Sequence, residues 1–223
     1  MSKAKTNQAR ILYSNMQLEN LAKADIPTQA QAMGFPLDET STKAKARFLG
    51  RDYLIDNSGV TAEDGRFVTV DTISVLSHYL CSQGRGDISE DYLPIGRLTG
   101  IASGASAGTS PSDQLSKPLG DKFGDDYEAF KKAALSAGMR HVGLSPAGAQ
   151  SFILEDLQKV PVKIDFFEAD EEFDSEIKFL FNAAANQFVS YEFLEILTMC
   201  MVVDLLMRAG LISDPEDCES SFI

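Results

Sequence analysis

The sequence predicts an α+β fold in which helices at both ends flank a mainly antiparallel sheet. Apolar residues recur at helical spacing over 8–23 and over 191–208. Between these segments, apolar and polar residues alternate over 162–166, which is the period-two pattern of a half-buried strand. No internal repeat or linker interrupts the chain. We therefore expect a single domain over 1–223.

The N-terminal segment, residues 1–38, is expected to be helical. Its second helix is predicted over Ile26–Met33, because Pro27 suits a first turn and Gly34 suits a C-terminal cap. Pro36 prevents the helix from continuing. The chain should therefore leave the helical segment near this proline.

Strand and turn signals follow. A strand is expected over Phe48–Ile55, with a turn at 56–59. The Asp-Gly pair at 64–65 is a hairpin-type turn signal and predicts a further strand over Arg66–Val68. Helical spacing then returns over Asp71–Ser82.

Residues 100–110 consist almost wholly of Gly, Ala, Ser and Thr. Such a segment cannot bury enough apolar area to order itself, so we expect a loop. It lacks the Gly-Lys-Ser/Thr signature, and a connector or substrate-side lid is favoured over a phosphate-binding loop. Helices are expected on its C-terminal side, over 112–123 and 125–137.

Residues 161–181 predict a β-hairpin with an acidic loop. Alternating apolar residues mark both strands. The loop carries six acids and no base, namely Glu168, Asp170, Glu171, Glu172, Asp174 and Glu176. We expect four charged residues to pair across the exposed face of the hairpin, namely Lys163, Asp165, Glu176 and Lys178.

The last predicted helix begins at Ser190 or Tyr191 and ends at about Arg208, and the apolar segment 191–209 is apolar nearly all round. A place in the core is the first interpretation and a homo-oligomer interface the second. Asp204 and Arg208 lie four residues apart and predict a surface ion pair. Charged residues interrupt the apolar run, so a membrane span is not expected. The polar tail over 213–223 is expected to be frayed.

The composition narrows the classes of partner and compartment. The formal net charge is −13 and the pI about 4.5, without clusters of Lys or Arg. Nucleic acid and anionic membranes are therefore not expected as partners. Three widely separated cysteines form no disulfide framework, and the first residues show no signal-type apolar core. We expect a cytoplasmic protein.

The acidic loop is the first candidate site. Glu168, Asp170 and Glu172 would lie on one face if the segment stayed extended, and their oxygens could hold a divalent cation such as Ca²⁺ or Mg²⁺. Carboxylates could also serve as a general acid or base. The alternatives are a solvated tip that blocks sheet-to-sheet pairing and a surface that docks a protein partner.

His78 and Cys81 form the second candidate. They are three residues apart on the predicted helix and can point the same way. Zinc or iron would need two or three more ligands that the local sequence does not supply. We expect His78 to pack or to hydrogen bond within the fold; a metal ligand, a proton carrier and a Cys–His nucleophilic pair are the alternatives.

Several segments together resemble an uncharacterised family, the domain-of-unknown-function family 3786. The matching segments are Phe48–Tyr53 (FLGRDY), Leu76–Leu80 (LSHYL), Phe130–Ala134 (FKKAA), Phe167–Phe173 (FEADEEF) and Lys178–Phe181 (KFLF). The resemblance covers about 40–208. It departs from the family pattern at Phe167, where tryptophan is typical, and at Asp174, where proline is usual.

The resemblance implies no established activity. The family is common in anaerobic bacteria and archaea, and some relatives resemble fusions with an iron–sulfur module, which implies an anaerobic or redox setting. This chain lacks the cysteines for such a cluster. Two function classes follow. The first is a non-catalytic accessory protein whose acidic loop docks a partner or cation; the alternative is an enzyme with a carboxylate or divalent-metal site between the acidic hairpin and the 100–110 loop.

Overall fold

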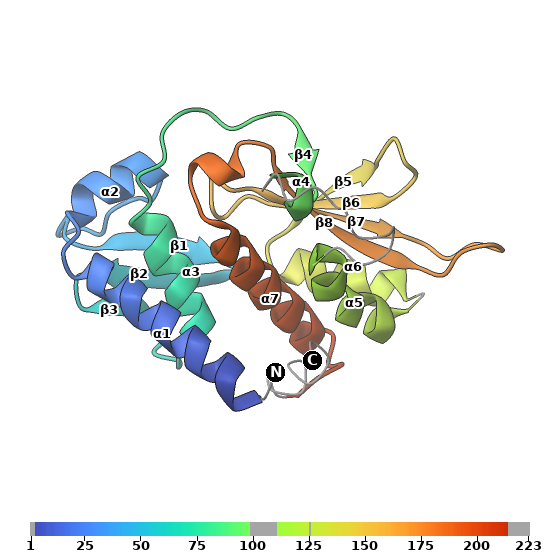
Figure 1. The fold of residues 1–223 in the computed structure, drawn as a ribbon, viewed down its shortest axis with the longest axis horizontal. Helices are drawn as coiled ribbons and strands as arrows, with labels where there is room; N and C mark the ends of the chain where they lie inside the picture. Colours follow the sequence, from blue (N-terminus) through green and yellow to red (C-terminus); the bar gives the residue numbers. More distant parts are fainter. Residues whose placement is uncertain (1–2, 99–110, 125, 214–223) are drawn as a thin grey trace.

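The computed structural model describes residues 3–98, 111–124 and 126–213 (Figure 1). The helices are α1 (Lys3–Leu21), α2 (Ile26–Met33), α3 (Val70–Leu80), α4 (Ile95–Leu98), α5 (Pro111–Phe123), α6 (Tyr127–Ser136), the 3-10 turn η1 (Ala185–Gln187) and α7 (Tyr191–Arg208). The strands are β1 (Ala44–Phe48), β2 (Arg51–Asp56), β3 (Gly59–Ala62), β4 (Tyr92–Leu93), β5 (Arg140–Leu144), β6 (Gln150–Leu154), β7 (Val162–Phe167) and β8 (Glu176–Asn182).

The strands form two antiparallel sheets. One has the order β1-β2-β3 and the other β4-β8-β7-β6-β5. Helices α1, α2 and α3 lie with the first sheet, and α5 and α6 with the second (Figure 1). This confirms the predicted α+β class with helices at both termini.

Helix α7 joins the two halves of the molecule. It packs against α3 on one side and against α5 and α6 on the other. Its buried apolar residues belong to one continuous cluster that includes residues of both sheets. The core interpretation of this helix is therefore confirmed, while a homo-oligomer through it stays a prediction. No helix in the described part of the chain is both long and apolar enough to cross a bilayer.

Local signals in the sequence placed several elements correctly. The Asp25 carboxylate caps α2 by accepting the Thr28 backbone N–H, and Gly34 ends the helix at φ 82°. Asp126 caps α6 by accepting the Ala129 N–H. The hairpin predicted over 161–181 is β7 and β8, which pair antiparallel.

Two strand predictions were wrong. The expected strand over Phe48–Ile55 is split into β1 and β2 by a tight turn at Leu49 and Gly50, whose φ angles are 50° and 68°. A β-carbon on Gly50 would lie 2.9 Å from the Ser136 carbonyl oxygen, so glycine is needed here. No strand forms over Arg66–Val68, and the chain after the 64–65 turn runs directly to α3.

The prediction that charged residues pair across the exposed face of the hairpin was also wrong. Asp165 is only 5 % exposed and accepts a hydrogen bond of 2.6 Å from the Ser151 hydroxyl. Its ion pair is with Lys163 on the same strand, and that of Lys178 is with Glu176 on its own strand. Residues two apart on a strand lie on the same face, so Lys163 is next to Asp165 and Glu176 is next to Lys178.

The ion pair of Asp204 and Arg208 forms as predicted but is not on the surface. The two side chains are 11 % and 19 % exposed. Arg208 also donates to the Leu49 carbonyl oxygen at 2.6 Å and to the Ser136 carbonyl oxygen at 2.8 Å. The loop predicted over 100–110, and all of the 213–223 tail except its first residue, lie outside the described residues.

Candidate functional site

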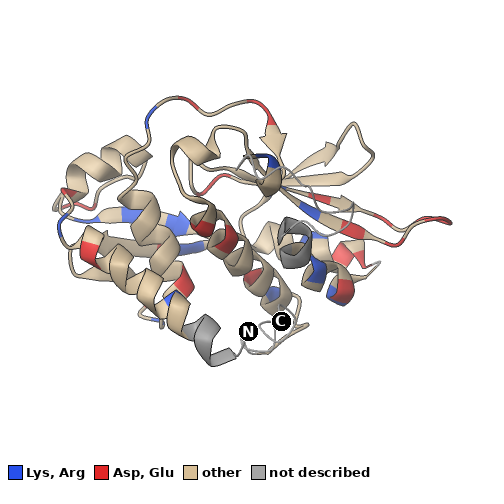
Figure 2. Cartoon of the chain, viewed as in Figure 1, with Lys and Arg blue, Asp and Glu red and all other residues tan. Residues whose placement is uncertain are grey.

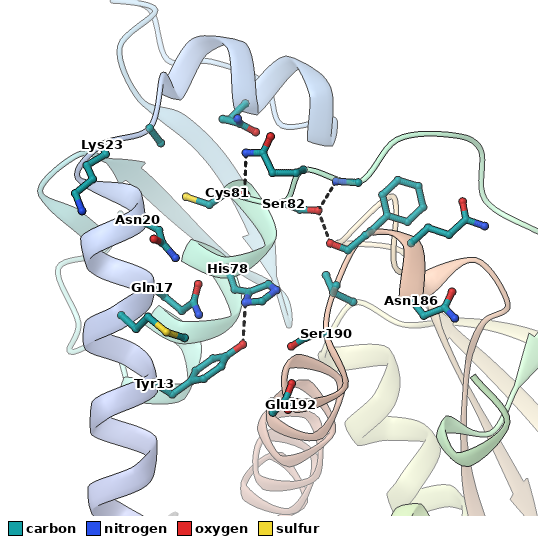
Figure 3. A pocket seen from close by; sticks show the side chains of 18 of the residues that line it. Tyr13, Gln17, Asn20, Lys23, His78, Cys81, Ser82, Asn186, Ser190 and Glu192 are labelled. Carbon is teal, nitrogen blue, oxygen red and sulfur yellow. Dashed lines mark hydrogen bonds between the residues drawn. The ribbon is translucent and has the colours of Figure 1, made fainter. Parts of the chain in front are cut away.

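A cleft of about 1180 Å³ opens between α1, α3 and the segment that leads into α7 (Figure 3). Helix α1 contributes Tyr13 and Gln17, α3 contributes His78, and the N-terminal end of α7 contributes Ser190. These segments are far apart in sequence and meet because α3 packs against both α1 and α7. A space of this volume can hold a small organic molecule.

Gln17 is the most unusual side chain in the cleft. The residue is 4 % exposed, yet within the described residues its amide forms no hydrogen bond. Figure 3 shows the amide directed from α1 toward the ring of His78. Among the described residues, the buried side-chain atom that has neither a hydrogen bond nor access to the surface is Ser77 Oγ, so the Gln17 amide atoms reach the open cleft. Because most buried polar side chains pair within the protein, an amide that faces a cleft without a protein partner is available to a ligand.

Tyr13 and His78 form a hydrogen-bonded pair beside this amide. The Tyr13 hydroxyl lies 2.8 Å from His78 Nδ1, and the two rings stack with an interplanar angle of 12°. The ring of Phe193 packs against His78 with a centroid separation of 5.0 Å. Burial raises the pKa of Tyr13 and lowers the pKa of His78, so both side chains are neutral at pH 7.

The charged side chains that line the cleft lie at its rim. Among the described residues they are Lys23, Asp25 and Glu192, and all three are exposed. Glu192 follows Ser190, whose hydroxyl accepts the Phe193 backbone N–H and caps α7. The inner wall is therefore polar but uncharged, whereas the mouth carries charges of both signs.

The wall opposite α1 is fixed by short contacts. The Ser82 hydroxyl donates to the Phe188 carbonyl oxygen and accepts the Gly84 backbone N–H at 3.1 Å. A β-carbon on Gly84 would lie 2.4 Å from the Gln187 carbonyl oxygen, so the two segments touch through their backbones. The cleft is thus a preformed feature of the fold on this side.

Cys81 lines the cleft one helical turn beyond His78. Burial raises the pKa of its thiol to about 11. The thiol therefore stays protonated at neutral pH, whereas an activated nucleophile needs the thiolate. The observed partner of His78 is Tyr13. The expectation that His78 hydrogen bonds within the fold is thus confirmed, and the geometry does not favour the Cys–His nucleophilic pair.

The acidic loop lies at the far end of the β7–β8 hairpin, away from α1 and α3 (Figures 1 and 2), the helices that line the cleft. Asp170 accepts the backbone N–H groups of Glu172 and Phe173, both at 2.8 Å, and these bonds lower the pKa of its carboxyl. The Phe173 side chain is left 71 % exposed. The strand ends at Phe167, so the following acids are not held on one extended face.

Within the described residues, no group of three or more His, Cys, Asp or Glu side chains lies together as a metal ion would require. Glu168, Asp170 and Glu172 are exposed, and the turn uses Asp170 as its own hydrogen-bond acceptor. Cation binding by these three residues stays a prediction. The enzyme site expected between the hairpin and the 100–110 segment involves residues outside the described ranges and also stays untested.

A family model described as a domain of unknown function, DUF3786, matches residues 25–204. The chain belongs to this family. The match confirms the resemblance seen in the sequence, and it includes His78 and Ser190 but leaves α1 outside. No curated protein matches the chain, and no solved structure matches it. DUF3786 membership carries no activity, so function has to be argued from the site.

The sequence did not reveal the α1 side of the cleft. The apolar spacing over 8–23 places Ile11 and Leu12 on the apolar face of the first helix, but they are 50 % and 62 % exposed. The face that α1 buries instead carries Ser14, Gln17 and Leu21. These three positions have helical spacing, and two polar residues on a buried face were the signal that could have been found.

Proposed function

We propose that this protein binds a small polar molecule in the cleft between α1, α3 and the N-terminal end of α7. The observation that carries the proposal is the amide of Gln17, which is nearly fully buried, faces the cleft and has no partner among the described residues. A ligand that hydrogen bonds to this amide would supply the partner that the described part of the protein does not.

The proposal keeps the protein in the class of binding or accessory proteins. A carboxylate-based active site in this cleft would be expected to bury one of its acids there. The acids that line the cleft, Asp25 and Glu192, are both exposed at the rim. Tyr13 and His78 offer hydrogen bonds and a flat surface to a ligand, which suits recognition of a polar molecule without requiring chemistry.

A library of small polar fragments tests the proposal by ligand-observed NMR. Wild-type protein should bind a subset of fragments, and Gln17→Leu should weaken that binding at least tenfold, which corresponds to about 1.4 kcal/mol. Gln8→Leu is the matched control, because Gln8 is exposed on the same helix and does not line the cleft.

The control should bind as wild type does. Absence of any fragment that binds wild type and loses affinity in Gln17→Leu would overturn the proposal. Equal binding by all three proteins would place the fragments elsewhere on the surface and would also count against the cleft.

We also propose that the acidic loop docks a basic partner. The specific observation is Phe173, which is 71 % exposed at the tip among carboxylates because Asp170 holds the turn in place. An apolar ring surrounded by charge is typical of an interaction surface.

A melting scan against Mg²⁺, Ca²⁺, Mn²⁺, Fe²⁺ and Zn²⁺ separates docking from metal binding at this loop. A cation at one hundred times its Kd would stabilise the protein by about 2.7 kcal/mol. A shift that Asp170→Asn abolishes would replace docking with metal binding. No shift with any cation would remove the metal-site prediction and leave the protein partner.

A further inference from the structure

We infer that the part of the ligand that enters the cleft is uncharged and presents a hydrogen-bond donor and an acceptor on one edge, as a primary carboxamide or a ring lactam does. This inference rests on the proposed function and specifies the chemical class of its ligand. It is carried by the amide of Gln17, by the position of the charged residues at the rim and by the Tyr13–His78 pair.

The side chain of Gln17 is complementary to the edge of another amide. It carries an NH₂ group with two donors and a carbonyl oxygen that accepts. A planar partner with a donor next to an acceptor can form two parallel hydrogen bonds with it, the same geometry by which glutamine reads an adenine edge. A partner with only acceptors, such as a carboxylate, leaves the glutamine oxygen unpaired.

The charge distribution of the cleft excludes an ionic group from its inner end. Lys23, Asp25 and Glu192 are exposed at the rim, whereas Gln17 is 4 % exposed and the neighbouring Tyr13 and His78 are half-buried and neutral. A charge buried without a counter-charge is far more costly than a buried amide. Because burial keeps His78 and Tyr13 neutral at pH 7, neither supplies that counter-charge.

The N-terminal end of α7 is the feature that could favour an anion, because a helix N-terminus carries partial positive charge. Two residues offset this effect. Ser190 already accepts one of the free backbone N–H groups, and Glu192 places a negative charge in the first turn. The groups that remain for a ligand are the hydroxyls, the imidazole and the Gln17 amide, which suit an uncharged polar edge.

Pairs of molecules of the same shape test the inference. Benzamide and benzoate differ only in the amide or carboxylate, as do nicotinamide and nicotinate. Ligand-observed NMR titration of wild-type protein at pH 7 should give at least tenfold tighter binding of each amide. Benzoate or nicotinate binding as tightly as its amide would overturn the inference while leaving the proposed function intact.

Gln17→Glu provides the second test, because it keeps the shape and removes the two donors. At a pH well above the usual carboxyl range, the affinity of this variant for benzamide should fall at least tenfold. Its affinity for benzamidine should rise, because the cationic edge of benzamidine carries only donors. Gln8→Glu adds the same charge outside the cleft and should change neither affinity. Unchanged benzamide binding in Gln17→Glu would show that the amide is bound elsewhere and would overturn the inference.

Discussion

The two ends of α7 treat buried polar groups in opposite ways. At its C-terminal end, Arg208 donates to Asp204 and to the carbonyl oxygens of Leu49 and Ser136. At its N-terminal end, the cleft contains Gln17, which is as well buried but has no hydrogen-bond partner in the described part of the chain. One end of α7 thus belongs to a saturated network, in which each polar group has a protein partner, whereas the cleft at the other end contains an amide without one.

The saturated network holds three segments together. Arg208 joins the β1–β2 turn at Leu49 to the end of α6 at Ser136. Asp156 accepts the Leu49 backbone N–H at 2.8 Å and fixes the same turn from the other side. Arg51 adds a contact of 3.5 Å to Asp204. Each of these polar groups has a protein partner, which is what a structural role requires.

The difference teaches how to separate structural from functional polar residues. When one partner is removed from a network in which every polar group is paired, the other partner stays buried without a hydrogen bond, and the fold is destabilised. Replacing a polar group that has no protein partner should have the opposite effect on stability, because no hydrogen bond is lost and an apolar side chain gains from a nearly buried position. The sign of the stability change therefore distinguishes the two ends of α7.

The largest expected effect is at Arg208. Arg208→Met keeps much of the side-chain volume and removes every donor, leaving Asp204 and two carbonyl oxygens with fewer partners. Breaking a buried ion pair in this way costs about 3–5 kcal/mol, so we expect the free energy of unfolding to fall by about 3 kcal/mol. Urea denaturation followed by circular dichroism measures the change.

Arg66→Met is the matched control. Arg66 pairs with Asp64 at 2.6 Å, but the two side chains are 69 % and 44 % exposed. Its loss should change the free energy of unfolding by less than about 1 kcal/mol. Equal effects from Arg66→Met and Arg208→Met would show that the network at the C-terminal end of α7 is not structural, and the comparison between the two ends would fail.

A smaller effect, with a defined pH dependence, is expected at Asp156. Burial raises the pKa of its carboxyl to about 6, although the backbone N–H groups of Leu49 and Gly50 oppose the shift. The unfolded value is near 3.9, so the folded state binds more protons between these two values. The contribution of Asp156 to stability therefore rises as the pH falls through 6 toward 4.

Asp156→Asn removes this titration. Relative to wild type, the variant should gain about 2 kcal/mol in free energy of unfolding between pH values of roughly 4 and 7, because only wild type must bury a carboxylate at the higher pH. For Asp64→Asn, the difference in free energy of unfolding from wild type should change with pH in the opposite direction, since hydrogen bonds from Arg66 lower the pKa of Asp64. A gap for Asp156→Asn that does not vary with pH would mean that this carboxylate is not desolvated.

The sequence predicted the elements better than it predicted which faces they bury. Capping residues are local, so the sequence predicts the end of α2 at Gly34 and narrows the N-cap of α6 to Asp125 or Asp126, of which Asp126 is the cap. The turn at Leu49 could not, because Arg208, 159 positions away along the chain, stabilises its carbonyl oxygen. A left-handed φ at Leu49 has no sequence signal beyond the adjacent Gly50.

The cleft was missed for a related reason. Its residues come from α1, α3 and α7, and only the packing of these helices brings them together. The acidic loop drew attention because its charges are adjacent in sequence, whereas Tyr13 and His78 are 65 positions apart. Sites assembled by tertiary packing carry little local signal, apart from polar residues that occupy the face a helix buries.

The smallest expected effect, and the one of opposite sign, is at Gln17. Gln17→Leu replaces an amide that has no protein partner with an apolar side chain of similar size at a position that is 4 % exposed, so no hydrogen bond within the described residues is lost and apolar burial is gained. We expect the free energy of unfolding to rise by about 1 kcal/mol, measured by urea denaturation without ligand. Gln8→Leu, at an exposed position of the same helix, should stay within about 0.5 kcal/mol of wild type.

The outcome for Gln17→Leu decides whether the cleft is a site or only a gap between helices. A stabilised variant that no longer binds polar fragments would show that the fold keeps Gln17 at a cost to its own stability, which is typical of a residue kept for a ligand. A destabilised variant would show that the amide contributes to the packing of α1 against α3. In that case both ends of α7 would be structural, and the cleft would lose the observation on which its function is proposed.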